Sequence, residues 1–406
     1  MPTTGDPPSR TRVILAFVGA FLAVALVYGC VFVVPPLIST FTDDLGLSHA
    51  QAGLLMSAYL AAYALTSFLS GPLADRVGLV RAISGGLVLA GLAGILFAST
   101  SSLAVFLVAR ALLGVSVAIV YAPGITLVSR LVPPQRLNLA VGIFLSGVSA
   151  GIAVAFLLTP LLEDALSWRW PFVVFAIATI AGAAAFALLA HGLGGARSAA
   201  GAERRGELAS LFRNAAFVRV CAGLFTGMFA LYGVYTWIAP YLDESAGFSA
   251  GRISLALTAG TVVGIPATMA AGWLADRLGR PVAVAGLGLA TAIAVLPFAM
   301  TDTISYPAAL AITLVASAGT TAGMSVLFAV PPRTVAPAQA AGAAGLSVSI
   351  AMAGAITSTY VGGALVGWTD GYDVPFVVFS IATLVAVLVV FPIAARGLAR
   401  ARPGSA

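Results

Sequence analysis

Long apolar segments constrain this chain more than any other feature. Of its 406 residues, 60 % are hydrophobic and 8 % are charged, whereas soluble globular domains carry roughly 25 % charged residues. A stretch of about 20 apolar residues is long enough to cross a bilayer as a helix. The chain therefore predicts an all-α integral membrane protein with twelve spans, near residues 13–38, 50–70, 80–98, 103–128, 137–161, 170–190, 217–240, 252–271, 281–300, 307–330, 338–362 and 374–394.

Arginines between these spans predict the orientation of the chain. One set of alternate loops holds nearly all of them, and the other set holds only Arg169 and Arg252 beside most of the acidic residues. Because cytoplasmic loops carry an excess of basic residues, we expect a multi-pass protein of the cytoplasmic (inner) membrane with both termini and the central loop in the cytoplasm. Arginines spread over many loops, and not gathered on one soluble face, argue against a nucleic-acid partner.

One long polar connection separates the spans into two groups of six. It covers residues 191–216 and is rich in Gly, Ala and Arg, a composition typical of a linker. We therefore expect an N-terminal six-helix bundle over residues 1–190, a cytoplasmic linker over 191–216 and a C-terminal six-helix bundle over 217–406.

Short motifs recur half a chain apart. The letters PFVVF occur at residues 171–175 and again at 375–379, and Gly46-Leu47-Ser48 matches residues 247–249. Both serines stand at the start of a span, where a Ser is a good N-cap. Since six spans are an even number, the two repeats enter the membrane in the same direction, which predicts a parallel repeat with pseudo-two-fold symmetry.

A charged motif also occurs twice. It reads GPLADRVG at residues 71–78 and GWLADRLGR at residues 272–280, and each copy lies between two apolar segments. Because a charged pair lies in hydrocarbon only at high cost, we expect each copy to form a short loop at the membrane surface.

This pair of motifs resembles the signature loop of the major facilitator superfamily of transporters, which joins the second and third helices and recurs between the eighth and ninth. The resemblance covers almost the whole chain and implies two six-helix bundles that hold a substrate near the midplane. It also implies conformational gating, in which the Asp caps a helix N-terminus and the Arg joins a cytoplasmic charge network. The residues that match are Gly71, Asp75, Arg76 and Gly78 in the first copy, and Gly272, Asp276, Arg277, Gly279 and Arg280 in the second.

The spans lack the residue groupings of an enzyme site. No Asp or Glu falls within them, and no paired-histidine spacing, nucleophile motif or phosphate-binding loop is present. We therefore expect no catalytic residue, no metal and no cofactor. Cys30 and Cys221 lie inside apolar segments, where we expect them to fill space in the packing. A receptor or a structural membrane protein is disfavoured, because duplicated halves are what alternating access uses.

Arg110 is the one charged residue well inside a span. It precedes Gly114 by four residues, which resembles a motif in the fourth helix of the family. An intramembrane charge is costly and usually faces a cavity or a partner, so two roles are open. Arg110 either braces the first and fourth helices through backbone carbonyls and hydroxyls, or it binds an anionic substrate.

Tyrosines on the helices that line the cavity of the family are the other candidates for substrate binding. They are Tyr28, Tyr121, Tyr232 and Tyr235. Each one alone fits packing, or the aromatic belt at a membrane interface, better than it fits contact with a substrate. As a group on cavity helices they are the candidates.

These features predict a secondary active or facilitative transporter of a small organic or inorganic anion, working by facilitated diffusion, exchange or proton symport. The alternative is proton-coupled efflux of a lipophilic compound. The fifth span carries Val148 after Gly147, where family exporters carry a Pro, and this weakens the efflux alternative. The expected partners are the substrate, protons or a counter-ion, and the lipid bilayer, and we expect a functional monomer.

Overall fold

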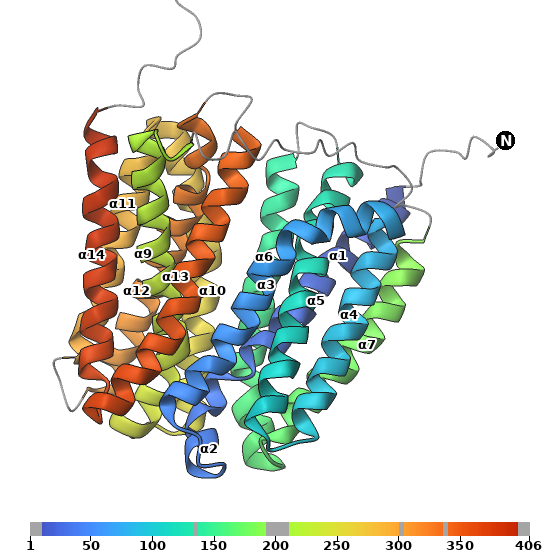
Figure 1. Ribbon diagram of the computed structural model, residues 1–406, viewed down its shortest axis with the longest axis vertical. Helices are drawn as coiled ribbons and strands as arrows, with labels where there is room; N and C mark the ends of the chain where they lie inside the picture. The colour runs from blue at the N-terminus through green and yellow to red at the C-terminus, as the bar shows by residue number, and fades with distance from the viewer. Residues whose placement is uncertain (1–9, 133–136, 192–210, 300–303, 336–339, 397–406) are drawn as a thin grey trace, which may run out of the picture. The chain divides into compact units, whose positions relative to one another are not determined.

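The computed structural model describes residues 10–132, 137–191, 211–299, 304–335 and 340–396, and every regular element in these ranges is helical, as predicted (Figure 1). The first half of the sequence contains α1 (Arg10–Phe32), η1 (Pro35–Leu37), α2 (Ile38–Asp43), α3 (His49–Val77), α4 (Leu79–Ala98), α5 (Leu103–Leu131), α6 (Leu137–Ala165) and α7 (Arg169–Leu189). The second half contains α9 (Ala215–Pro240), η3 (Tyr241–Ser245), α10 (Ala250–Leu278), α11 (Pro281–Thr291), η4 (Ala292–Ala299), α12 (Tyr306–Phe328), η5 (Pro331–Arg333), α13 (Ala340–Thr369) and α14 (Asp373–Arg396).

These helices account for the predicted spans. Within the described ranges, 11 helical runs are long and apolar enough to cross a membrane. The remaining predicted span, at residues 50–70, corresponds to α3, which has 29 residues and would extend roughly 44 Å at about 1.5 Å per residue. The predicted linker at residues 191–216 lies mostly outside the described residues.

The described residues divide into two compact units. The first unit draws on Met1–Val33, Ala62–Leu158 and Leu162–Ala200, and the second on Val34–Ala61, Thr159–Leu161 and Gly201–Ala406. The segment Val34–Ala61 thus comes from the first half of the sequence but packs within the second unit. The domain boundaries expected from the sequence, at residues 190 and 217, remain a prediction.

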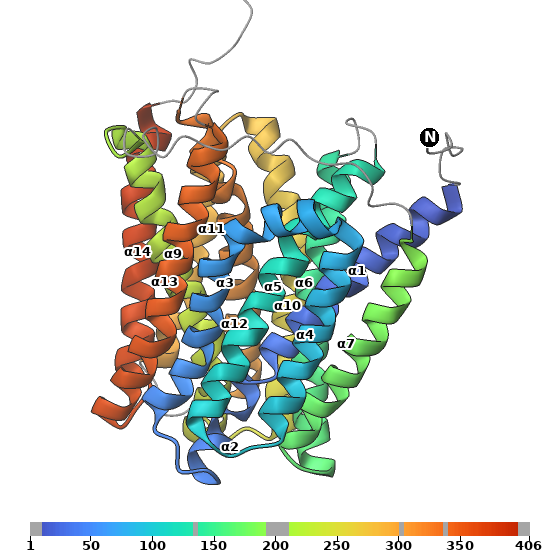
Figure 2. The same ribbon diagram turned by 45° about the vertical axis from the view of Figure 1, so that its right-hand side comes forward.

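Each unit is a bundle of long helices, as two views of the ribbon show (Figures 1 and 2). In the first unit, α4 packs against α5 and α7, and α1 packs against the same two helices. In the second unit, α9 packs against α13 and α14, α11 against α12 and α14, and α10 against α12. The pairs α1–α7 and α9–α14 are therefore repeat counterparts.

The PFVVF motif shows what the repeat preserves. Its last residue, Phe175 on α7, places its ring against Gly29 of α1, where no Cβ would fit. In the second unit Phe379 on α14 lies against Gly233 of α9 in the same way. Each glycine leaves room for a ring from the neighbouring helix, so the motif encodes a helix–helix contact that is repeated in both units.

A second pair of glycines allows two backbones to approach. Gly151 of α6 lies against the Ala25 carbonyl of α1, and Gly354 of α13 lies against the Phe225 carbonyl of α9. Small residues at helix interfaces permit such close packing within membranes. Gly142, in contrast, has no atom within 4 Å of the position of a Cβ.

Both copies of the charged motif differ from the expected loop. Residues 71–77 form the end of α3, and residues 272–278 form the end of α10. Gly78, with φ +93°, separates α3 from α4, and Gly279, with φ +60°, separates α10 from α11 together with Arg280. A left-handed residue ends a helix at low cost when it is Gly, and α4 starts directly after Gly78. The expectation of a short loop was wrong because each motif continues the preceding helix up to its glycine.

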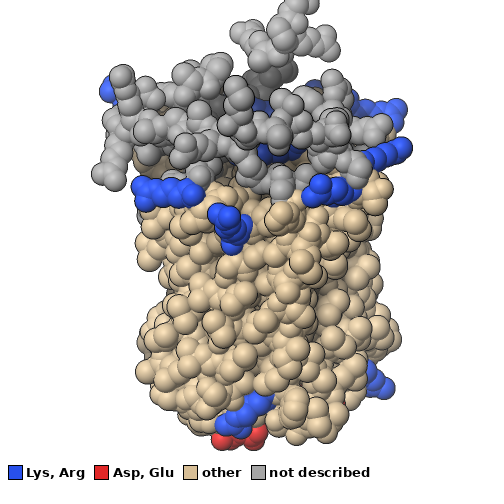
Figure 3. Space-filling model, turned by 90° about the vertical axis from the view of Figure 1, so that its right-hand side faces the viewer, with Lys and Arg blue, Asp and Glu red and all other residues tan. Residues whose placement is uncertain are grey.

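Charged side chains are segregated along the helices. In the face shown in Figure 3, most arginines gather at one helix end and the acidic side chains lie at the opposite end. This is the pattern from which the sequence predicts a cytoplasmic and an outer side, and the orientation itself stays a prediction.

Candidate functional site

Arg110 lies in the interior of the first unit. It is on α5, its side chain is 1 % exposed, and its Nη1 donates a hydrogen bond of 3.0 Å to the carbonyl oxygen of Val31. Val31 is the penultimate residue of α1. The sequence left two roles open for Arg110. This hydrogen bond is the contact that one of them requires, a brace between the first and fourth spans.

The local sequence explains why the Val31 carbonyl needs a donor. In a continuing helix the N–H of residue 35 would bond this oxygen, but Pro35 has no N–H. The chain continues past this point as η1, a 3-10 turn that begins at Pro35. A buried carbonyl without a donor costs about 1–3 kcal/mol, and Arg110 meets that need from a neighbouring helix.

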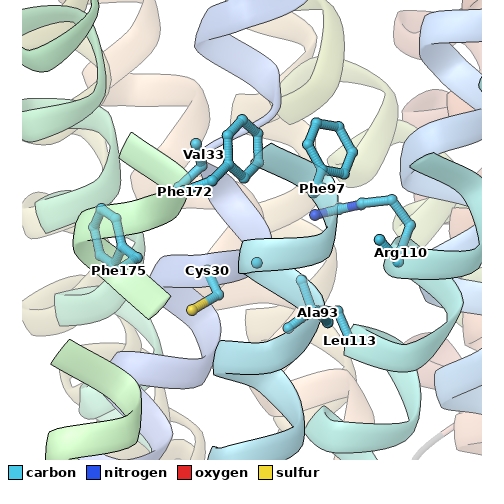
Figure 4. A pocket seen from close by; sticks show the side chains of 10 residues that line it. Cys30, Val33, Ala93, Phe97, Arg110, Leu113, Phe172 and Phe175 are labelled. Carbon is cyan, nitrogen blue, oxygen red and sulfur yellow. The ribbon is translucent and has the colours of Figure 1, made fainter. Parts of the chain in front are cut away.

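A small pocket adjoins the guanidinium (Figure 4). Arg110 points from α5 toward the rings of Phe97 and Phe172, while Cys30 and Phe175 lie further along the wall. The enclosed space is about that of one water molecule. An organic anion would therefore need a more open conformation to reach this pocket. The complete lining is Cys30, Val33, Ala93, Gly94, Phe97, Ala109, Arg110, Leu113, Phe172 and Phe175.

The candidate tyrosines of the first unit lie together. The ring centroids of Tyr28 and Tyr121 are 6.2 Å apart, and Tyr63 of α3 approaches Tyr121 at 6.4 Å. Tyr28 is buried. The sequence placed Tyr28 and Tyr121 on cavity helices, and the structure brings them into one aromatic cluster.

The candidate tyrosines of the second unit lie on α9. The phenol of Tyr232 lies beside that of Tyr59 from α3. Tyr235 lines a second small pocket together with three hydroxyl side chains, Ser317, Thr320 and Thr383. Its remaining lining residues are aliphatic, so this pocket has hydroxyl groups where the Arg110 pocket has aromatic rings and a cation.

The gating candidates are described in part. The surroundings of Gly71 and the side chains of Asp75 and Asp276 are not among those described, so the expected capping by the two aspartates stays a prediction. Gly272 has no atom within 4 Å of the position of a Cβ. Arg76 and Arg280 are exposed, and Arg277 lies 5.0 Å from the ring centroid of Trp273.

A polar cluster that the sequence analysis missed lies at the far end of the second unit. Oε2 of Glu244 is 2.7 Å from the Tyr372 hydroxyl, which donates to it, and 3.3 Å from Nε2 of His49. Ser39 interacts with both Glu244 and Asp243. Glu244 belongs to η3, a π-helical turn, and such turns are frequent at functional sites. Burial and the nearby Glu244 carboxylate raise the pKa of the Tyr372 phenol, which keeps it a donor.

Close backbone packing supports this cluster. A Cβ at Gly363 of α13 would meet the His49 carbonyl, and a Cβ at Gly53 of α3 would meet the Thr359 carbonyl. Nε1 of Trp237 donates to that same carbonyl at 3.1 Å. The sequence does place one histidine and several acidic residues at the same helix end. It contains no pattern that would indicate which of them form a pair.

A family model described as "Major Facilitator Superfamily" matches residues 20–324 and 238–406. Among curated relatives, the "Gentisate transporter" of Corynebacterium glutamicum is 26 % identical over 94 % of this chain and 87 % of its own length. The "Probable anion transporter 3, chloroplastic" of Arabidopsis thaliana is 35 % identical over 33 % of this chain and 27 % of its own length. The "Inner membrane transport protein YnfM" of Escherichia coli is 29 % identical over 40 % of this chain. The chain thus covers well under half of the two partial relatives, at 27 % and 38 % of their lengths.

Solved structures share the fold. A bacterial homologue of the human lysosomal transporter Spinster, crystallised in an inward-facing and occupied conformation, superposes with a TM-score of 0.80 at 18 % identity, over 99 % of this chain and 100 % of the other. The inward-facing and unoccupied form gives a TM-score of 0.79 at 17 % identity. At these identities the likeness concerns the fold alone.

Proposed function

Because the chain belongs to the Major Facilitator Superfamily, we propose that this multi-pass membrane transporter moves a small anion across the membrane by alternating access. The fold, the two repeated units and the small-molecule substrate follow from the family. The charge of the substrate is the part that needs an argument from this chain.

Arg110 carries that argument. Its hydrogen bond to Val31 requires a donor but not a charge, and a neutral amide or hydroxyl would serve the carbonyl as well. Keeping a guanidinium 1 % exposed within a membrane span is costly. We infer that the charge is retained because it attracts an anion when the pocket opens. A guanidinium has five N–H donors, so a brace and a ligand are compatible roles for one side chain.

Names of relatives support the same class of substrate. One relative, aligned over 94 % of this chain, is named a gentisate transporter, and another, aligned over a third of it, is named a probable anion transporter. Efflux of a lipophilic compound draws no support from these names. We propose anion transport and not catalysis as the activity.

The aromatic and hydroxyl groups would complete the binding site. We propose that Tyr28 and Tyr121 in the first unit, and Tyr232 and Tyr235 in the second, contact the substrate through rings and phenols. Asp75, Asp276 and the arginines beside them would gate the conformational change. Transport would proceed by facilitated diffusion, exchange or proton symport in the cytoplasmic membrane, by a monomer whose termini are both cytoplasmic.

The test is ligand-dependent melting of purified protein in detergent. Gentisate, inorganic phosphate and the lipophilic cation tetraphenylphosphonium are compared on wild type, Arg110→Lys and Arg110→Gln. A ligand present at 100 times its Kd stabilises the folded state by about 2.7 kcal/mol, so an anionic ligand should raise the melting temperature of wild type clearly. Lys keeps the charge without the forked donors and should retain part of the shift.

Gln should lose the shift yet still melt cooperatively, because its amide remains a donor for the backbone. Thr313→Val, in the second unit, serves as the control and should keep the full shift. A Gln variant with an undiminished anion shift would remove Arg110 from the site. A shift with the cation and with neither anion would overturn anion transport in favour of efflux.

A further inference from the structure

The cluster around Glu244 ties together segments that are far apart in the sequence. His49 begins α3 and Ser39 belongs to α2, both in the first half of the sequence. Glu244 and Tyr372 belong to the second half. Oε2 of Glu244 is the common acceptor, at 3.3 Å from His49 and 2.7 Å from Tyr372. One carboxylate therefore links both sequence halves at this helix end.

We propose that His49, Glu244 and Tyr372 form a proton-responsive latch that holds this helix end closed when His49 is protonated. The inference rests on the proposed alternating-access function, because a transporter of that kind must open and close each end in turn. Opening this end would part α2 and the start of α3 from η3 and Tyr372, and every contact of the latch would break.

Histidine makes the latch sensitive to pH. A histidine side chain changes charge between about pH 5 and pH 8. The imidazolium forms a charge-assisted hydrogen bond with the Glu244 carboxylate, whereas a neutral ring offers a weaker neutral donor. The extra stabilisation of the closed end is therefore present at the acidic side of this window and is lost as the pH rises through it.

Other ionisable groups reach the cluster from the elements around it. Asp43 of α2 and Asp243 of η3 lie within electrostatic range of Tyr372, and α14 begins with Asp373. The only ionisable side chain of α13 is Tyr360, which is exposed. From α9, the ring of Trp237 lies 6.0 Å from that of His49. From α10, which packs against η3, Arg252 adds a positive charge near the helix start. The three aspartates named above are acidic, and a positive imidazolium is the form that they complement.

The exposure of His49 and Glu244 indicates that the latch senses pH and does not transport the proton. The side chains of His49 and Glu244 are 26 % and 30 % exposed with the latch formed. Protons can therefore reach His49 from solvent at this end while it is closed. The latch would report the pH on one side of the membrane and bias the conformation accordingly.

A reporter cysteine at Ser57 tests the latch without any substrate. Ser57 lies on α3, is 7 % exposed, and bonds the Ile356 carbonyl at 2.9 Å and Oγ1 of Thr359 at 2.6 Å. Ser57→Cys is nearly isosteric, and Cys30→Ser with Cys221→Ser removes the two native thiols. Modification by a methanethiosulfonate reagent is timed on purified protein in detergent at about pH 5.5 and at about pH 8, which span the histidine range.

Each rate is expressed relative to the same reporter carrying His49→Gln, because thiolate content itself rises with pH. At the acidic pH the reporter with His49 should react roughly threefold to fivefold more slowly than with Gln, as expected for a partly exposed ion pair. At the alkaline pH the ratio should approach one. His49→Arg, which keeps a positive charge, should react slowly at both.

Two further variants separate the latch from general effects. His191→Gln changes the only other histidine of the chain, which has 2, and should behave as the parent. Tyr372→Phe should speed labelling at both pH values and keep the pH dependence. Equal ratios at the two pH values, loss of the pH dependence in His191→Gln, or a reporter that stays unreactive in every variant would each overturn the latch. A pH-dependent reporter in a protein that binds no anion would leave the latch standing and remove the proposed substrate class.

Discussion

Two pockets occupy corresponding places in the two units and differ in chemistry. The Arg110 pocket is built from α1, α4, α5 and α7, and the Tyr235 pocket from their counterparts α9, η4, α12 and α14. The first contains a buried cation among aromatic rings. The second contains a phenol and three hydroxyls. Thr313 lies as far from the start of α12 as Arg110 lies from the start of α5. The Thr313 hydroxyl donates to a carbonyl of its own helix at 2.8 Å.

The two halves of the chain share their helix–helix contacts but differ in the side chains that line the pockets. Contacts between helices are preserved, because Gly29 with Phe175 and Gly233 with Phe379 form the same ring-on-glycine arrangement. Polar side chains that face the pockets have diverged. The pocket of the first unit therefore offers a positive charge, and the pocket of the second unit offers hydroxyl groups.

The largest expected effect tests whether the close backbone contacts at Gly151 and Gly354 are equally rigid in the two units. Gly151→Val and Gly354→Val should each destabilise the protein by about 3 kcal/mol, because the new side chain would meet a backbone carbonyl that cannot move aside. Thermal unfolding in detergent measures this, with Gly142→Val as the control in open space. A Gly151 variant as stable as the Gly142 variant would show that α6 and α1 are not closely packed.

Replacing Arg110 tests the chemical difference between the units. Arg110→Leu should cost about 2 kcal/mol, because the Val31 carbonyl is left buried without its donor. Thr313→Val, at the matching place in the second unit, should cost less than about 1 kcal/mol, because its carbonyl partner already has a helical donor. Both values come from melting in the absence of ligand. Equal losses would mean that Arg110 contributes no more to stability than an intrahelical hydroxyl.

Capping at the starts of α3 and α10 gives a smaller expected difference between the two repeats. Ser48 and Gln51 bond each other reciprocally, with the Gln51 N–H donating to Oγ of Ser48 at 3.2 Å and the Ser48 N–H to Oε1 of Gln51 at 2.9 Å. Ser249, its repeat counterpart, makes no side-chain cap. Ser48→Ala should therefore cost about 1 kcal/mol in thermal stability, and Ser249→Ala should leave the melting temperature unchanged. A loss at Ser249 as large as at Ser48 contradicts the asymmetry.

The smallest effect concerns the charged motifs. Arg277 lies over the ring of Trp273 at 5.0 Å, whereas the first copy has Pro72 in place of the Trp. Trp273→Ala should cost about 0.5 kcal/mol, as expected for an exposed cation–π contact. Melting of this variant beside Trp368→Ala, another exposed tryptophan, isolates the contribution of Arg277. The same loss in both would assign the effect to the ring alone.

Features governed by local sequence were predictable. Apolar runs of sufficient length gave the helices, and equal spacing of motifs gave the repeat, because both depend on residues close together in the chain. The burial of Cys30 and Cys221 followed from their apolar surroundings and is confirmed. The ends of α3 and α10 were misplaced, because the Asp-Arg pair marks a membrane surface while the following glycine sets where the helix stops.

Features governed by distant residues were not predictable in the same way. The sequence left both a brace and an anion ligand open for Arg110, and the Val31 carbonyl as its partner is seen only in the structure. His49, Glu244 and Tyr372 are separated by large stretches of chain, so a single sequence contains no signal that pairs them. The ring contacts of Tyr121 with Tyr28 and with Tyr63 depend on side-chain direction, which a single sequence does not specify.

Pro35 has an evolutionary consequence. Since its missing N–H leaves the Val31 carbonyl to Arg110, the two positions form one coupled unit and their substitutions should be non-additive. Restoring an amide with Pro35→Ala would make the loss of the arginine less damaging, provided that the helix continues there. As far as stability alone is concerned, descendants of this chain should therefore accept an apolar residue at position 110 only after the proline has gone, whereas a neutral donor could replace the arginine before that.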